Sequence, residues 1–474
     1  MGRKKTNRVI LEHLQVTGAG AKGKAIAKAP DGRVVFIKNA VPGDVVDVQT
    51  TKKRKSYFEG NAINIHEASP KRVEPPCQHF KNCGGCKWQN MGYEFQLEYK
   101  EAEVVNNLRR LGKIELPEVT PIAGSAAQYF YRNKMEFSFS DSKWLTPKQI
   151  KSDEVIENRN ALGFHIAGMW DKILDIEKCH LQRDPSNAIR NGIRDFAVKN
   201  NLSFFSPRDQ EGLLRTLMIR TSSTGELMVL VQFYEDQIKE RELAMNYLKQ
   251  NFPEITSLLY VINNKGNDTI YDQDVICYSG KDHIFEEMEG LKFKINAKSF
   301  YQTNSEQAYE LYKITRDFAD LKGDEIVYDL YTGTGTIAQF VAAKARKVVG
   351  IESVPDAIEA AKQNAQLNGI ENFSFHVGDM KNVFTKEFVI KHGEPDVIIT
   401  DPPRDGMHKD VVSQLLQIGA ERIVYVSCNS ATQARDLGLL DAMYQVVKFQ
   451  PVDMFPQTHH VENVVLLTKR NSIE

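Results

Sequence analysis

The sequence has no long apolar run, few cysteines and no overall excess of charge of either sign. Its apolar stretches all fall short of the roughly 20 residues that cross a bilayer, so we expect no membrane partner and a cytoplasmic protein. Six cysteines among 474 residues are too few for a disulfide scaffold. A hydrophobic content of 42% supplies apolar surface for several folded cores, which excludes a mostly disordered chain.

Charge is unevenly distributed along the chain. Residues 1–60 carry 13 Lys and Arg against 5 Asp and Glu, whereas the whole chain carries 61 against 62. The same region contains short apolar segments separated by Gly-containing turns, which predicts a small β-barrel. These segments are residues 34–37, 45–48 and 62–65. A basic barrel is suited to binding a phosphate backbone, so we expect a nucleic acid as the partner.

Three of the cysteines, Cys77, Cys83 and Cys86, lie close together after a stiff Pro-Pro segment. Glycines between the last two allow the loop to wrap tightly around an ion. The fourth ligand is not local, and Cys179 is the best candidate among the remaining cysteines. Zinc and an iron–sulfur cluster both accept four thiolates, so the spacing alone leaves both open.

The C-terminal part, from about residue 303, alternates strands and helices, which predicts a doubly wound α/β sheet. The predicted strands are residues 326–330, 347–351, 373–377, 396–400 and 422–427, with two more near 445–450 and 463–468. The predicted helices are residues 304–320, 337–345, 355–368 and 409–418. Ligands in such sheets bind beyond the carboxyl ends of the strands. Residues 128–300 mix strands and amphipathic helices, with an exposed insertion at 141–160.

A glycine loop and two acids favour a nucleoside cofactor at that edge. Residues 329–335 (Asp-Leu-Tyr-Thr-Gly-Thr-Gly) close a predicted strand and open a helix. Glu352 ends the next strand, where a carboxylate can accept ribose hydroxyls, and Asp379 ends the third. The loop lacks the remaining Gly and Lys of pyrophosphate-binding motifs. S-adenosylmethionine therefore fits best.

Three further residues at strand ends are candidates for chemistry. Asp401 is followed by Pro402-Pro403, which restrict its backbone and aim its carboxylate. Arg404 stands where amine methyltransferases carry an aromatic residue, which argues against amine methylation. Cys428 ends a strand beside an expected helix N-terminus, which would lower the pKa of its thiol. Glu462 is the expected acid–base group, because the adjacent histidines before it point in divergent directions.

Taken together, these residues resemble the RNA uracil-5-methyltransferase family over nearly the whole chain. The resemblance implies a multidomain protein with an oligonucleotide-fold TRAM barrel at 1–66, a central α/β domain at 67–300 and a methyltransferase domain at 301–474. It aligns Cys77, Cys83, Cys86 and Cys179 with the four ligands of a 4Fe–4S cluster. It also adds Gln302, within Phe-Tyr-Gln-Thr-Asn at 300–304, as a cofactor-loop residue.

The resemblance further implies a mechanism and the residues that perform it. The Cys428 thiolate would add to carbon 6 of uracil, so that carbon 5 takes the methyl group. Glu462 would then remove the carbon-5 proton, and elimination would free the cysteine. Asp401 would lie against both the uracil and the cofactor. The residues expected to hold S-adenosylmethionine are Gln302, Tyr331, Glu352, Asp379 and Asp401.

The predicted substrate is a uridine of 23S rRNA, flipped out of a loop, because the cluster and the barrel occur together in that branch of the family. The alternatives are the same reaction on tRNA and a non-catalytic RNA-binding protein of ribosome assembly. Methylthiotransferases also combine a TRAM domain with a cluster, but the Cys77-x5-Cys83 spacing breaks their motif. We expect RNA and not DNA as the partner, and a monomer.

Two residues depart from the pattern of the family. Thr332 replaces a cysteine in the glycine loop, and we expect this change to be harmless. Ser430 replaces the proline that usually follows Cys-Asn, which is expected to loosen the loop behind Cys428.

Overall fold

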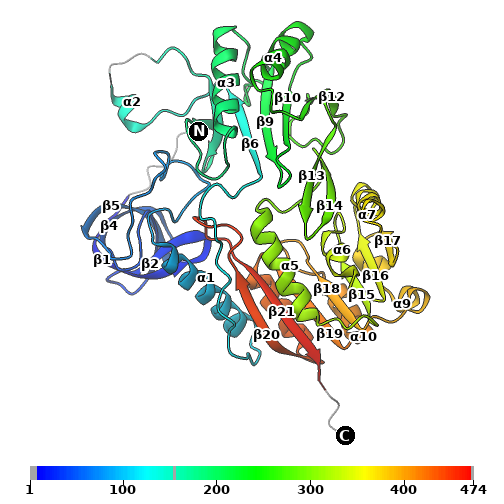
Figure 1. The fold of residues 1–474 in the computed structure, drawn as a ribbon. Helices are drawn as coiled ribbons and strands as arrows, with labels where there is room; N and C mark the ends of the chain where they lie inside the picture. Colours follow the sequence, from blue (N-terminus) through cyan, green and yellow to red (C-terminus); the bar gives the residue numbers. More distant parts are fainter. Residues whose placement is uncertain (1–7, 153–155, 471–474) are drawn as a thin grey trace.

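The structure is a computed structural model that describes residues 8–152 and 156–470. Four sheets follow one another along the described chain: a barrel, a central sheet, a two-stranded sheet and a C-terminal sheet (Figure 1). The predicted multidomain fold, with an N-terminal barrel and a C-terminal methyltransferase-type sheet, is confirmed. In the described part of the chain, none of the helices has the length and apolar character needed to cross a membrane.

The N-terminal barrel is closed by five strands in the order β1-β2-β3-β5-β4. They are β1 (Ile10–Gly20), β2 (Lys24–Lys28), β3 (Val34–Lys38), β4 (Val45–Lys53) and β5 (Tyr57–Glu67). Alternate residues point inward, as Val46 and Val48 of β4 do, and both are fully buried. Lys52 and Lys53 extend the same strand into solvent, which leaves basic side chains outside an apolar core.

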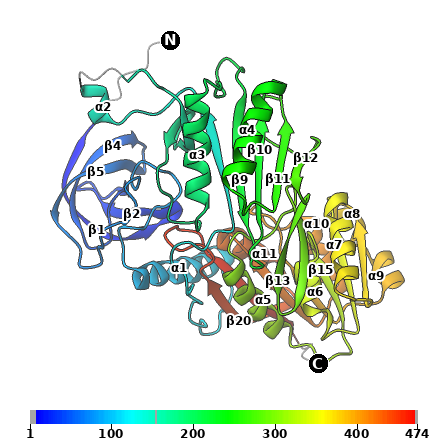
Figure 2. The ribbon, with the colours of Figure 1, turned by 45° about the horizontal axis from the view of Figure 1, so that its top comes forward.

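The central sheet has seven strands in the order β12-β11-β10-β9-β6-β7-β8. They are β6 (Lys134–Ser140), β7 (Ala161–Ile166), β8 (Met169–Asp175), β9 (Leu214–Thr221), β10 (Leu227–Phe233), β11 (Ser257–Ile262) and β12 (Ile276–Gly280). Helices α3 (Ser186–Lys199) and α4 (Ile238–Asn251) cover one face (Figure 2). The predicted insertion contains a short helix, α2 (Pro147–Lys151), and its residues 153–155 lie outside the described part.

The C-terminal sheet has the order β17-β16-β15-β18-β19-β21-β20. Five strands are parallel: β15 (Ile326–Leu330), β16 (Lys347–Glu352), β17 (Phe373–Val377), β18 (Val397–Thr400) and β19 (Arg422–Ser427). The last two, β20 (Tyr444–Val452) and β21 (Glu462–Lys469), are antiparallel. The predicted strands thus exist within a few residues of the expected bounds.

Helices cover both faces of this sheet. One apolar cluster packs α5 (Ser305–Ala319), α6 (Thr336–Ala342) and α7 (Pro355–Leu367) on the first face. The second face carries α8 (Met380–Val383), α9 (Lys386–His392), α10 (Lys409–Ile418) and α11 (Ser430–Leu440). Helices α8 and α9 were not among the predicted elements, whereas α11 begins where a helix N-terminus is expected after Cys428.

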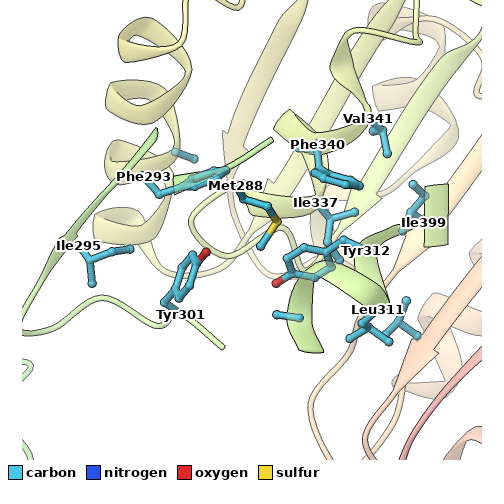
Figure 3. Close-up of a cluster of buried hydrophobic side chains, with 14 of the residues drawn as sticks. Met288, Phe293, Ile295, Tyr301, Leu311, Tyr312, Ile337, Phe340, Val341 and Ile399 are labelled. Carbon is cyan, nitrogen blue, oxygen red and sulfur yellow. The ribbon is translucent and has the colours of Figure 1, made fainter. Parts of the chain in front are cut away.

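A two-stranded hairpin connects the central sheet to the C-terminal one. It consists of β13 (His283–Met288) and β14 (Leu291–Asn296). Figure 3 shows its side chains Met288 and Phe293 meeting Tyr312 of α5 and Phe340 of α6, with Tyr301 beside them. This apolar contact fixes the segment that contains Gln302 against the C-terminal sheet.

Helix α1 (Tyr93–Asn107) belongs by sequence to the predicted central region but packs against the C-terminal sheet, between the barrel and β20 (Figures 1 and 2). Its Lys100 is fully buried, and the Nζ atom lies 2.6 Å from Oδ1 of Asp453, which is also fully buried. The Tyr93 hydroxyl donates to Oδ2 of the same carboxylate at 2.9 Å. This buried ion pair joins segments at opposite ends of the chain.

Candidate active site

The strand register brings three of the predicted residues to one edge of the C-terminal sheet. β21 runs antiparallel to β19 with Ser427 paired to Asn463, so the next residues, Cys428 and Glu462, face each other across the two strands. β18 is parallel to β19 and ends at Thr400, which places Asp401 at the same edge. Cys428 and Asp401 are half-buried, whereas Glu462 is 6% exposed.

The loop that begins at Asp401 is fastened to the start of α11. The Arg404 carbonyl accepts hydrogen bonds from Asn429 Nδ2 at 2.9 Å and from Thr432 Oγ1 at 3.1 Å. Asn429 also caps α11, because its side-chain oxygen accepts from the Ala431 N–H at 3.1 Å. The loop and the residue after Cys428 therefore hold each other in place.

Burial and neighbouring carboxylates change the pKa values of the side chains at this edge of the sheet. Desolvation and the nearby Asp401 carboxylate together raise the pKa of Glu462 to about 8, against the effect of Arg404. Burial and the neighbouring Asp329 raise the pKa of Asp401 to about 7. The expected lowering of the Cys428 pKa is not seen. Desolvation, with the Glu462 and Asp401 carboxylates, raises it to about 11, while Arg404 acts in the opposite direction.

The glycine loop follows β15 and adopts the left-handed backbone that its sequence suggests. Tyr331, Gly333 and Gly335 have φ values of 65°, 55° and 76°. A Cβ atom on Gly335 would lie 2.9 Å from Cβ of Ala361 in α7, so glycine is also required there for packing. The Glu352 carboxylate accepts from the Gly333 N–H at 3.2 Å, which joins two of the predicted cofactor residues.

Asp379 and Gln302 lie at the two ends of this region. Asp379 is exposed and caps α8, with its carboxylate 3.3 Å from Lys381 Nζ. Gln302 is half-buried, and its main-chain carbonyl accepts from Asn133 Nδ2 at 2.9 Å. Two residues later, Asn304 caps α5 and donates to the Met454 carbonyl at 2.9 Å. The Gln302 segment is thereby tied to the loop that leads into Glu462.

Thr332 and Ser430, the two residues that depart from the family pattern, both make specific hydrogen bonds. Thr332 Oγ1 donates to Oδ2 of the buried Asp329 at 2.6 Å, so its hydroxyl supports a carboxylate that is 1% exposed. Ser430 is also buried, and its hydroxyl accepts from Asn107 Nδ2 of α1 at 2.8 Å. The expected loosening behind Cys428 is thus not observed, because α1 anchors that residue.

Two glutamines without any recognisable sequence signal hold the loop before Glu462. Gln96 of α1 donates from Nε2 to the Gln457 side-chain oxygen at 3.0 Å, and its own oxygen accepts from the Gln457 N–H at 2.9 Å. The Gln457 carbonyl accepts from the N–H groups of Lys87 and Trp88 at 2.9 and 3.1 Å. Lys87 directly follows Cys86, so the cysteine loop contacts the Glu462 loop.

The four predicted metal ligands lie around one cavity of about 360 Å³ between the cysteine loop and the central sheet. Cys77, Cys83 and Cys86 come from the loop after the barrel, and Cys179 comes from the turn before α3. The Cys179 N–H donates to Asn187 Oδ1 of α3 at 2.8 Å, which fixes that turn. Burial raises the pKa of Cys83 to about 11 and that of Cys86 to about 12.

Comparison with known proteins defines the class to which this fold and site belong. The sequence profile of the tRNA (Uracil-5-)-methyltransferase family matches residues 214–470, and the profile of the TRAM domain matches residues 8–63. The chain therefore belongs to the tRNA (uracil-5-)-methyltransferase family, and its C-terminal sheet is that of an S-adenosylmethionine-dependent methyltransferase.

The similar proteins cover the chain from end to end. It is 60% identical over 453 residues to an uncharacterized RNA methyltransferase of Bacteroides thetaiotaomicron, covering 95% of this chain and 100% of that protein. A Porphyromonas gingivalis protein of the same description is 55% identical, with 96% and 99% covered. The crystal structure of Pyrococcus abyssi tRNA (uracil-54, C5)-methyltransferase, in complex with S-adenosyl-L-homocysteine, has a TM-score of 0.74 and 26% identity, covering 97% of this chain and 100% of that one.

Proposed function

We propose that this protein methylates carbon 5 of a uridine in RNA, with Cys428 as nucleophile and Glu462 as general base. The observation that carries the proposal is the β19–β21 register, which sets a thiol opposite a buried carboxyl group at the ligand-binding edge. A pyrimidine carbon is a weak nucleophile, and a thiol that adds next to it is the device that activates it.

The residues at the edge divide the reaction between them. Bound S-adenosylmethionine supplies an electrophilic methyl group on sulfur. The Cys428 thiol gives its proton to solvent, and its sulfur bonds to carbon 6. The electron pair that this leaves on carbon 5 takes the methyl group, and S-adenosylhomocysteine is released. Glu462 removes the carbon-5 proton, the carbon 6–sulfur bond breaks, and the cysteine is released. Asp401 and Arg404 flank the pair, and Arg404 favours the thiolate by its charge.

The residues predicted to hold the cofactor fit that role by position. Glu352 follows the second parallel strand, as a ribose-binding carboxylate does, and its carboxylate already contacts the glycine loop. Asp379 is exposed at the end of the third strand and is available to a ligand. Tyr331 is half-buried near these two carboxylates, and Gln302 is half-buried at the other end of the region. We assign S-adenosylmethionine to these four residues together with Asp401.

The four cysteines are proposed to hold a metal–thiolate centre, because the surroundings provide unneutralised positive charge. Arg190 is fully buried, and its guanidinium donates to the carbonyls of Ile176 and Glu177 at 3.1 and 2.8 Å. It makes no ion pair with a carboxylate of the described residues, and its charge acts on the Cys179 thiol against the burial that raises the pKa of that thiol. A buried cation without an anion is costly, and a thiolate centre would supply the anion.

The spacing of the sulfurs favours a cluster over a single zinc ion. Four thiolates around zinc, at about 2.3 Å each, lie about 3.8 Å from one another. Among the described residues, no three cysteine sulfurs lie within 4.8 Å of one another. We propose a 4Fe–4S cluster, which would staple the loop after the barrel to the turn before α3. Brown protein with a broad absorption near about 400 nm that dithionite bleaches is expected, and colourless zinc-loaded protein would contradict it.

The proposed substrate is 23S rRNA, with a flipped uridine in a loop and the basic barrel supplying affinity. The combination of cluster and barrel supports this choice through the family resemblance. tRNA is the second candidate, because the Pyrococcus abyssi protein of the same architecture is described as a tRNA methyltransferase.

Methyl transfer from labelled S-adenosylmethionine to unmodified 23S rRNA and tRNA tests the proposal. Wild type and Cys428→Ala are compared, with the exposed Cys277→Ser as control. We expect 5-methyluridine in 23S rRNA, lost in Cys428→Ala and kept in Cys277→Ser. Label in tRNA alone would change the substrate but keep the chemistry, and no label in either RNA, with RNA binding intact, would indicate a non-catalytic binding protein.

A further inference from the structure

A cluster of side chains on the outside of the barrel has no part in the proposed reaction. Strand β4 lies between β1 and β5 in the closed barrel, and each of the three strands contributes one residue: Asp47, His13 and His66. Oδ1 of Asp47 lies 2.7 Å from Nε2 of His66 and 3.9 Å from Nδ1 of His13. One ligand atom from each residue lies within 4.8 Å of the other two.

The backbone is locally adapted to bring these groups together. The pairing of β1 with β4 shifts between Leu11 and Leu14, and His13, inside that bulge, has a φ of 53°. This conformation lets the His13 N–H donate to Oδ1 of Asp47 at 3.0 Å and turns its ring over that of His66. The two rings stack at 3.9 Å between centroids, 16° from parallel.

We propose that His13, Asp47 and His66 form a binding site for a divalent transition-metal ion such as zinc. Two imidazoles and one carboxylate are a donor set that suits zinc, cobalt, nickel and copper, and three protein ligands leave a position open to water. Donor atoms around zinc lie about 3.3 Å apart, given bond lengths of about 2.0–2.2 Å. The two distances to Asp47 bracket this value, and the site is completed when one of the two stacked imidazole rings rotates so that both ring nitrogens point at the same ion.

The surroundings of Asp47 are compatible with a bound metal ion. In the described part of the chain, Asp47 forms no ion pair with a lysine or arginine, so its charge is left to the two imidazoles. Asn64 Nδ2 donates to its second oxygen at 3.3 Å and orients the carboxylate, as hydrogen-bond donors behind the ligands do at metal sites. The His13 and His66 side chains are 68% and 28% exposed, so an ion can reach them from solvent.

Cobalt(II) titration of the full-length protein, with its cysteine centre as isolated, tests this site. We expect one saturable equivalent with weak visible bands and no intense near-ultraviolet thiolate absorption, and zinc should displace it. His13→Gln and His66→Gln should each weaken binding at least tenfold, and Asn64→Ala by about tenfold. His283→Gln is the matched control, because His283 pairs with Asp282 but has no second histidine.

Each alternative result is decisive. Absence of a saturable weak band, or a band that both histidine variants leave unchanged, would refute the site. Thiolate absorption alone would assign the cobalt to cysteines and also refute it. Circular dichroism of each variant establishes that it is folded, and Asp47→Asn, which keeps the size of the side chain, provides an independent variant should a histidine change unfold the barrel.

Discussion

The Glu462 carboxyl group combines deep burial with a neighbour of the same charge, Asp401. Both conditions favour the protonated acid, which explains why its pKa lies near 8. A base with such a pKa is strong enough to remove a proton from carbon yet is partly ionised at neutral pH. The residue thus has the acid–base properties that its proposed role requires.

Replacing Glu462 by glutamine removes the base but keeps the shape of the side chain. We expect turnover to fall by at least about a hundredfold, because a positioned base contributes roughly 10²–10⁴ to the rate. The Cys428–RNA adduct, already methylated, should accumulate as a band of reduced mobility in denaturing gels. Glu421→Gln is the control, since that side chain is 74% exposed, and wild-type turnover in Glu462→Gln would contradict the assignment.

The Thr332 hydroxyl supports the buried Asp329 carboxylate, so the threonine in the glycine loop has a structural use. Thr332→Val keeps the shape but removes the donor. We expect a loss of about 1–3 kcal/mol in the free energy of unfolding, larger at pH 8 than at pH 5, because the hydrogen bond favours the ionised carboxylate. Urea unfolding at both pH values measures it. Thr332→Ser retains the hydroxyl and should behave nearly as wild type.

Helix α11 illustrates where reasoning at the level of elements falls short. Strands 326–330 and 422–427 are apolar runs bounded by turn residues, and their bounds follow from the sequence alone. The sequence predicts that a helix begins after Cys428, but Gly438 within α11 obscures how far that helix extends. The structure explains this glycine, because a Cβ atom there would lie 2.9 Å from the carbonyl oxygen of Gly112. A close contact between segments so far apart in the chain cannot be recognised from the residues that surround Gly438.

The candidate site, too, is predicted from the sequence only in part. The glycine loop, Asp401 and Cys428 end predicted strands, so their common edge follows from the alternation of strands and helices. The proximity of Cys428 and Glu462 does not follow from that alternation, because it depends on β21 lying beside β19 and not at the edge of the sheet. Gln96 and Gln457 were missed altogether, since an amide pair between residues so far apart has no sequence signature.

The Gln96–Gln457 pair connects three elements, and Gln96→Leu should disturb all of them. The change leaves the Gln457 amide and the carbonyls of Trp88 and Met91 without their partner. We expect a loss of about 2–3 kcal/mol in stability, and slower proton removal, seen as longer-lived Cys428–RNA adduct. Gln450→Leu, whose amide makes one bond to the Pro121 carbonyl, is the control. Unchanged adduct lifetime would show that the pair is structural only.

The whole molecule should respond to pH in an unusual direction. Asp329 and Asp401 have pKa values raised to about 7 and Glu462 to about 8, chiefly by burial. Between pH 6.5 and 8 the folded protein therefore keeps protons that the unfolded chain has lost, so the free energy of unfolding falls as pH rises. The half-buried His459 and His460, with lowered pKa values, act mainly below about pH 6.5.

Thermal unfolding without ligand measures this effect. We expect the melting temperature to fall from pH 6.5 to pH 8.5, and Asp401→Asn to make the fall smaller. A melting temperature that rises over the interval would show that these carboxyl groups are ionised in the folded protein.

The buried ion pair of Lys100 and Asp453 also affects the order in which the chain folds during its synthesis. The two residues are 353 positions apart, and at roughly 5–20 residues per second a ribosome needs on the order of 20–70 s to reach the second after the first. Until Asp453 has been synthesised, the Lys100 ammonium group lacks that carboxylate, so the ion pair that holds α1 against the C-terminal sheet cannot form. The barrel is therefore complete while α1 is still undocked, and α1 can dock only when almost the last strand has been synthesised. Chaperones would encounter the chain in that partly folded state.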